Sequence, residues 1–74
     1  MNPKDIKKRL GQNILRLRKD YGLSRKALAR LSHISTDRLR QVEHGDSSAK
    51  LYDYHLKRLG EIFYICVDEL FEEK

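Results

Sequence analysis

The chain has 74 residues, 39% of them hydrophobic and none of them tryptophan, which is enough for one core over residues 1–74 but not for a second domain or a deep catalytic pocket. The one cysteine excludes an internal disulfide, and the absence of a signal-like stretch or of an apolar run of 18 residues predicts a soluble, cytoplasmic protein without a membrane contact. The net charge is +5, because residues 1–44 carry twelve basic and four acidic side chains whereas residues 45–74 carry four and seven, and this suits either a phosphate-binding surface or a merely solvated one.

The first expected helix begins near the N-terminus and ends at Gly22. Asn2 is a favourable N-cap, and Pro3 follows at a position where a helix tolerates proline. Apolar residues then recur at steps of three and four on one face, namely Ile6, Leu10, Ile14, Leu17 and Tyr21. The opposite face is basic, with Lys7, Lys8, Arg16 and Lys19. Gly22 suits the left-handed residue that ends many helices.

Two short helices are expected next, joined by three or four residues. Ser24 and Ser35 are N-cap candidates, and the second of these helices covers residues 36–44 and is closed by Gly45. The apolar positions expected on the inner sides of the two helices are Leu28, Leu31, Leu39 and Val42. This pattern predicts a helix-turn-helix unit over about residues 24–45.

A polar loop and a longer helix complete the pattern. The loop starts at Asp46, and the helix begins between Ser48, as a cap, and Asp53, as an early helical acid, and ends near Tyr64. Its expected inward residues are Leu56, Leu59, Ile62 and Phe63, and a last turn or short fifth helix is indicated by Val67, Leu70 and Phe71. We therefore predict an all-α fold, a compact bundle of four to five short helices with a central helix-turn-helix.

Three stretches at matched spacing resemble the motifs of a known family. Residues 22–29, GLSRKALA, are similar to G-L-S-Q-x-x-L-A, residues 34–45 to V-S-x-x-x-I-x-x-I-E-N-G, and residues 56–65 to L-x-x-I-A-x-x-L-x-V. These are motifs of the Cro/repressor-type helix-turn-helix family, and the resemblance covers roughly residues 9–71. It implies a lambda-repressor-like DNA-binding domain, and a small transcriptional regulator, a repressor, that binds double-stranded DNA with its recognition helix 36–44 in the major groove.

The resemblance also implies particular roles for charged residues. Arg18 and Glu43 match a pair in which an arginine of the first helix holds the glutamate that ends the recognition helix, although both could be ordinary surface charges. Arg25 stands where the family has a glutamine that contacts a phosphate, and arginine can make the same contact. The loop after Gly45 is about two residues longer than usual, so it stays open which of Ser47, Ser48 and Lys50 meets the DNA backbone.

If helix 36–44 enters the major groove, its outward side chains face the bases. Thr36 can pack its methyl group on thymine, Arg40 can bind guanine and Gln41 can bind adenine. Asp37 either accepts a hydrogen bond from cytosine or is merely a helix-starting acid. Phosphate contacts are expected from Ser24, Arg25, Lys26, Arg38, Ser47, Ser48 and Lys50. For each of these residues, simple solvent exposure is the alternative.

Metal and enzyme chemistry find little support in the sequence. His33, His44, His55 and Cys66 recur every eleven residues, whereas zinc ligands usually come in pairs two to five residues apart. We expect no metal or other cofactor here, but two surface histidines, a helix cap and a buried thiol. The sequence contains no catalytic triad pattern and no phosphate-cradling glycine loop, so we predict neither an enzyme nor a small-molecule site.

The competing function is a protein-interaction module, such as an antitoxin-like or anti-repressor domain. Aromatic residues of the kind that interfaces favour are Tyr52, Tyr54, Phe63, Tyr64 and Phe71. A partner-binding helix would expose apolar residues, however, and helix 36–44 offers polar ones. The sequence therefore favours DNA over a protein partner.

The C-terminal third suggests a homodimer. Five apolar residues crowd into residues 64–71, namely Tyr64, Ile65, Val67, Leu70 and Phe71. This is more than one short helix can bury against a single domain, so we expect a dimerisation segment, although the same residues could simply close the monomer core. Two copies would read a palindrome, whereas one recognition helix reads too few base pairs to select a site.

Overall fold

The computed structural model describes residues 3–46 and 48–72, with residues 3 and 4 as backbone only. In that part of the chain every regular element is helical: α1 (Pro3–Asp20), α2 (Arg25–Ser32), α3 (Thr36–Glu43), α4 (Asp53–Phe63) and a short 3-10 helix, η1 (Val67–Phe71). The predicted all-α fold class is confirmed. The expected N-cap Asn2 lies outside the described residues, and none of the helices described is long and apolar enough to cross a membrane.

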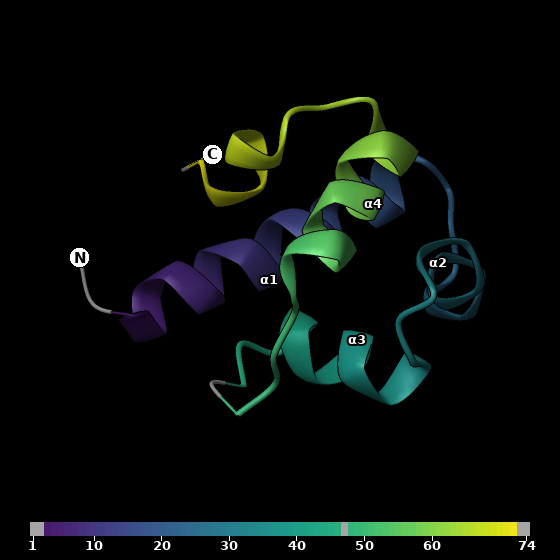
Figure 1. The fold of residues 1–74 in the computed structure, drawn as a ribbon. Coiled ribbons are helices and arrows are strands. Elements are labelled where there is room, and N and C mark those ends of the chain that lie inside the picture. The colour runs from purple at the N-terminus through teal and green to yellow at the C-terminus, as the bar shows by residue number, and fades with distance from the viewer. Residues whose placement is uncertain (1–2, 47, 73–74) are drawn as a thin grey trace.

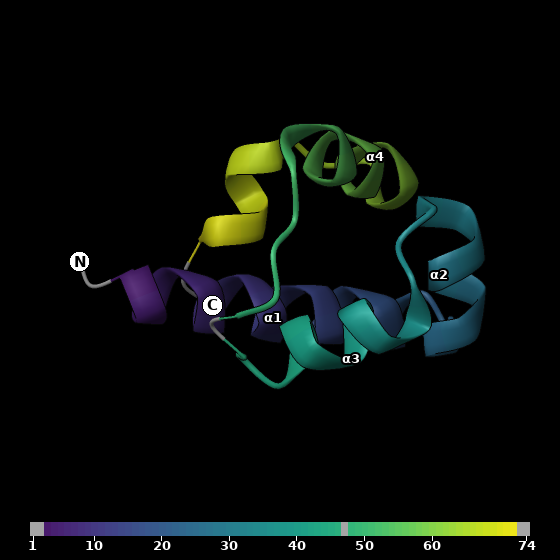
Figure 2. The ribbon, with the colours of Figure 1, turned by 60° about the horizontal axis from the view of Figure 1, so that its bottom comes forward.

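The helices form two levels joined at both ends. Figure 1 shows α1 as the longest element, with α4 above it and α3 below it. In Figure 2, α2 joins the levels at one end and η1 joins them at the other. The packing agrees with this view, because α1 contacts α3 and η1, while α4 contacts α2 and η1. One core lies between the two levels.

That core is built mostly from the positions that the apolar periodicity indicates. The buried apolar residues are Leu10, Ile14, Leu17, Leu28, Ile34, Leu39, Val42, Ala49, Leu59, Phe63 and Leu70. The exceptions among the expected inward positions are Ile6, Tyr21 and Leu31, which are 37%, 47% and 48% exposed. The buried positions of α2 are Leu28 and Ser32, four residues apart, so the inner stripe of this short helix passes to one side of Leu31.

The helix ends follow the capping pattern of the sequence. The Ser24 hydroxyl accepts a hydrogen bond from the Ala27 N–H at 3.0 Å, and the Ser35 hydroxyl accepts one from the Arg38 N–H at 3.1 Å. Gly45 has a φ of +77°, and this left-handed residue lets the Asp46 N–H bond back to the Gln41 carbonyl at 2.9 Å. The open question of where α4 begins is settled at Asp53, since Tyr52 is its N-cap.

The burial of His55 and Cys66 is the reverse of the prediction. His55 is buried, its ring lies 4.1 Å from the ring of Tyr54 between centroids, and its Nδ1 accepts a hydrogen bond from the Tyr52 N–H at 3.1 Å. Cys66 is exposed, because it lies in the bend between α4 and η1 as the N-cap of η1. The expectation of a surface histidine and a buried thiol was therefore wrong.

Burial and, to a lesser extent, the charge of Arg38 lower the pKa of His55 below its ordinary value of 6.5. In the unfolded chain His55 takes up its proton near pH 6.5, whereas in the folded chain its lowered pKa delays protonation to a lower pH. The contribution of His55 to the free energy of unfolding is therefore full above pH 6.5 and is lost as the pH falls below that value. Protonation of Nδ1 would also break the bond to Tyr52. We expect the urea midpoint of the wild type to fall between pH 7.5 and pH 5.5.

The control is His55→Gln, because a glutamine oxygen can accept the same N–H in a capping box but does not titrate. The midpoint of this variant should change less between the two pH values. An equal pH dependence would show that His55 does not contribute to it.

Candidate nucleic-acid interface

Glu43, the last residue of α3, is the centre of a buried ion-pair cluster. Its side chain is 2% exposed, and its carboxylate accepts two hydrogen bonds from Arg18, from Nε at 2.7 Å and from Nη2 at 3.1 Å. The remaining terminal nitrogen of Arg18 donates to the Leu23 carbonyl at 3.0 Å. The pair that the resemblance implied is thus present, and it ties α3 to α1 and to the start of the turn before α2.

A second arginine on Glu43 was not predicted. Arg25 donates to Glu43 Oε1 from Nε at 3.0 Å and from Nη2 at 2.9 Å. We expected Arg25 to point to a phosphate, but in the free chain its guanidinium lies on this carboxylate. Its spacing of 18 residues from Glu43 carries no local signal, so the sequence could have indicated this contact only through the side-by-side placement of α2 and α3.

Close approach of α1 to α3 depends on Gly11, another residue that the sequence analysis missed. A Cβ atom at this buried position would overlap the Val42 carbonyl oxygen and lie 2.9 Å from its carbon. A glycine inside an apolar helical pattern is the signal that could have found it, since such a residue usually has a packing reason.

The outward face of α3 is polar. The four predicted base-contacting residues, Thr36, Asp37, Arg40 and Gln41, are all exposed. Leu39 and Val42 face the core, so the helix presents apolar and polar sides cleanly. Arg40 Nη2 lies 3.4 Å from Asp37 Oδ1. This exposed pair is weak and leaves both side chains able to change partner.

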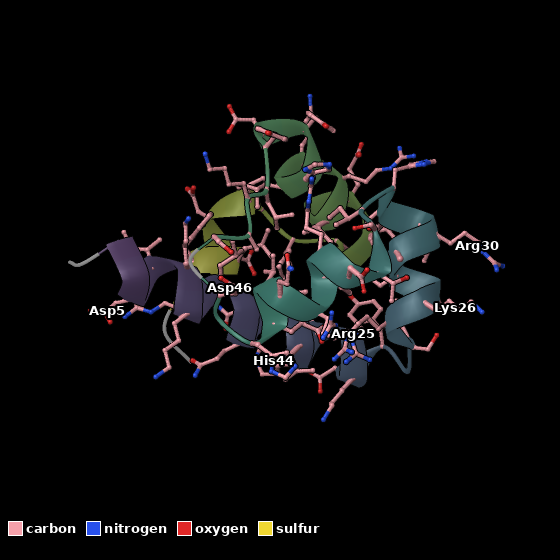
Figure 3. All side chains as sticks on the ribbon, turned by 90° about the horizontal axis from the view of Figure 1, so that it is seen from below. Asp5, Arg25, Lys26, Arg30, His44 and Asp46 are labelled. Carbon is pink, nitrogen blue, oxygen red and sulfur yellow. The ribbon has the colours of Figure 1, made fainter. Side chains whose placement is uncertain are left out.

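The predicted phosphate contacts surround α3 but are not equally open. Lys26 and Lys50 are exposed, and Arg38 is half-buried. Figure 3 shows Arg25 beside α3, with Lys26 and Arg30 pointing outward from α2. The Ser24 hydroxyl already caps α2. Ser47 lies outside the described residues.

The loop after α3 adds a negative charge close to these groups. The Ser48 hydroxyl donates to Asp46 Oδ1 at 2.7 Å, and the Ser48 N–H donates to the same atom at 2.9 Å. These bonds lower the pKa of the Asp46 carboxyl below its ordinary value, so it stays ionised. Ser48 is thus engaged within the loop in the free chain.

The segment 64–71 divides between core and surface. Leu70 is fully buried and Phe71, which is half-buried, packs against the core, so both help to close the monomer, as the alternative to the dimer contact predicted. They are held there by Asn13, whose Nδ2 donates to the carbonyls of Leu70 and Glu72, each at 2.7 Å. Tyr64 is different, since it is 88% exposed.

No group of three histidine, cysteine, aspartate or glutamate side chains that could hold a metal is found in residues 3–46 and 48–72. The sequence matches no protein-family model, and a comparison with curated proteins gives no significant match.

Proposed function

We propose that this chain binds double-stranded DNA sequence-specifically as a small transcriptional regulator, a repressor acting in the cytoplasm, with α3 in the major groove. The observation that carries the proposal is the presentation of α3. Its outward side chains are all polar and exposed, while Glu43 at its end is held by arginines from α1 and α2. A helix whose angle is fixed in this way can place Arg40 and Gln41 on base edges.

Selection of random duplexes by the purified protein, repeated at two salt concentrations, tests the proposal directly. We expect enrichment of a defined sequence and an affinity that falls with salt, as phosphate contacts require. The double variant Arg40→Ala/Gln41→Ala should then bind the selected duplex at least about tenfold more weakly, because each base contact contributes about 1–3 kcal/mol.

The matched control is Asp53→Ala/Arg58→Ala, which removes two exposed side chains of α4 on the opposite level. It should bind like the wild type. If the α3 double variant also binds the selected duplex like the wild type, α3 is not the recognition helix.

A protein-interaction module remains the second candidate, and one observation favours it. Leu31, Tyr54 and Tyr64 have large apolar or aromatic side chains, and each is about half exposed or more. Such residues are typical of protein interfaces. Failure to enrich any duplex in the selection, with no salt-dependent binding, would favour this candidate over DNA.

We also propose that the chain acts as a homodimer through Tyr64 and its surroundings. Tyr64 has a φ of +56°, which is uncommon for an aromatic residue, and its exposed ring adjoins a shallow hollow. That hollow is lined in part by Gly60, Ile65 and Val67. Two copies related by a twofold axis could each place the ring in the hollow of the other, since such contacts are self-complementary.

Sedimentation equilibrium at micromolar concentration checks this dimer. We expect Tyr64→Asn to weaken self-association, because asparagine tolerates the left-handed backbone but lacks the ring. Tyr54→Asn, which removes an exposed ring from the start of α4, should associate like the wild type. A wild type that is monomeric under these conditions contradicts the dimer.

A further inference from the structure

The two arginines on Glu43 are bound unequally. Glu43 Oε2 accepts only from Arg18 among the bonds described, whereas Oε1 is shared by Arg18 Nη2 and both donors of Arg25. Two guanidinium groups and one carboxylate leave the cluster with an excess of one positive charge. This excess lies at the junction of α2 and α3.

Arg25 is the more loosely held of the two. Both of its hydrogen bonds end on Glu43 Oε1, and its side chain is 31% exposed. Arg18 is only 11% exposed, and it is additionally fixed by the Leu23 carbonyl. If Arg25 turned away, Arg18 would still neutralise Glu43 with two bonds. Departure of Arg25 would therefore leave no buried charge without a partner.

We propose that Arg25 is an exchangeable phosphate ligand, which Glu43 holds in the free chain and which moves to a DNA phosphate on binding. This inference rests on the proposed DNA-binding function. A phosphate offers Arg25 the same paired acceptor geometry as a carboxylate. Arg25 is the first residue of α2 and lies beside α3 in Figure 3, so a phosphate drawn to the excess charge meets the guanidinium that is free to leave.

The exchange keeps every charge paired. In the free chain Glu43 orients Arg25 and limits its rotamers, which reduces the entropy lost when the phosphate binds. In the complex the Arg18–Glu43 pair continues to hold α3 while Arg25 pairs with the phosphate. The contact contributes affinity without sequence preference, because phosphates carry no sequence information.

The arginine Nε–H signals in proton–nitrogen NMR spectra test the exchange. Arg18 and Arg25 each donate an Nε–H to Glu43. On titration with duplex DNA, we expect the chemical shift of the Arg25 Nε–H signal to change and that of the Arg18 Nε–H signal to remain the same. Shifts in the α3 amides without a shift of Arg25 would overturn the exchange while leaving DNA binding intact. Shifts of both arginine signals would show that the release is not confined to Arg25, which also overturns it.

Two variants provide independent measurements. Arg25→Gln should lower the salt dependence of DNA binding by about one counterion, whereas Arg58→Gln, which removes an exposed cation of α4, should leave it unchanged. Arg25→Gln should also lower the urea midpoint less than Arg18→Gln does, and equal losses would contradict the looser attachment of Arg25. If duplex DNA shifts no signal of the wild type, the proposed function and the exchange both fail.

Discussion

Glu43→Gln is expected to lower the free energy of unfolding by about 3–5 kcal/mol, since breaking a buried pair leaves uncompensated charge. The change removes the negative charge to which two guanidinium groups are bound, one of them almost buried. Small domains have about 5–15 kcal/mol of stability in total. A thermal midpoint lower by more than about 10 °C is the expected measurement.

Glu61→Gln is the matched control, because it removes the same charge from an exposed position on α4. Its midpoint should stay within a few degrees of the wild type. A second comparison sets Arg18→Ala against Lys19→Ala, one buried and one exposed cation at adjacent positions of α1. If Glu43→Gln and Glu61→Gln melt together, or Arg18→Ala and Lys19→Ala do, the cluster contributes no more than a surface contact.

Gly11→Ala is expected to have the second large effect, a loss of about 3 kcal/mol at the upper end of what overpacking costs. The new Cβ would meet the backbone of Val42 and lie 3.3 Å from Glu43 Cα. Backbone cannot rotate away as a side chain can, so α3 would have to move off α1. The loss should exceed the gain of about 1 kcal/mol that alanine normally brings to a helix.

Urea unfolding of Gly11→Ala beside Gln12→Ala measures this effect. Gln12 is the exposed neighbour on the same helix, and its replacement should change stability by no more than about 0.5 kcal/mol. Gly11→Ala should also weaken the selection of a duplex, because it displaces the end of α3 that Arg18 holds. A Gly11→Ala protein as stable as the wild type would contradict the close approach of α1 and α3.

Local signals in the sequence predicted the secondary structure well. Ser24 and Ser35 do cap α2 and α3, and Gly45 does end the turn after α3. Each of these interactions spans three to five residues, so the residues that make it are neighbours in the sequence. The resemblance added one long-range contact, Arg18 with Glu43, which the structure contains.

Predictions that depended on how one helix packs against another were less accurate. Leu31 was expected inside but is exposed, because the buried face of α2 runs through Leu28 and Ser32. Leu70 was expected at a dimer contact, with closure of the monomer core as the alternative, and it lies in the core because η1 folds back onto α1, where Asn13 binds its carbonyl. In both cases the apolar pattern correctly identified a hydrophobic position but did not indicate which neighbouring element, if any, covers that side chain.

The sequence by itself therefore determined the helices, the caps of α2 and α3 and the polar character of α3, because periodicity and capping act between residues a few positions apart. Only the tertiary structure decided that Arg25 shares Glu43 with Arg18, that Gly11 lets α1 and α3 meet, and that Tyr64 stays exposed. These features depend on where separate helices lie relative to one another. Packing of the whole core sets that placement, and no short stretch of sequence contains it.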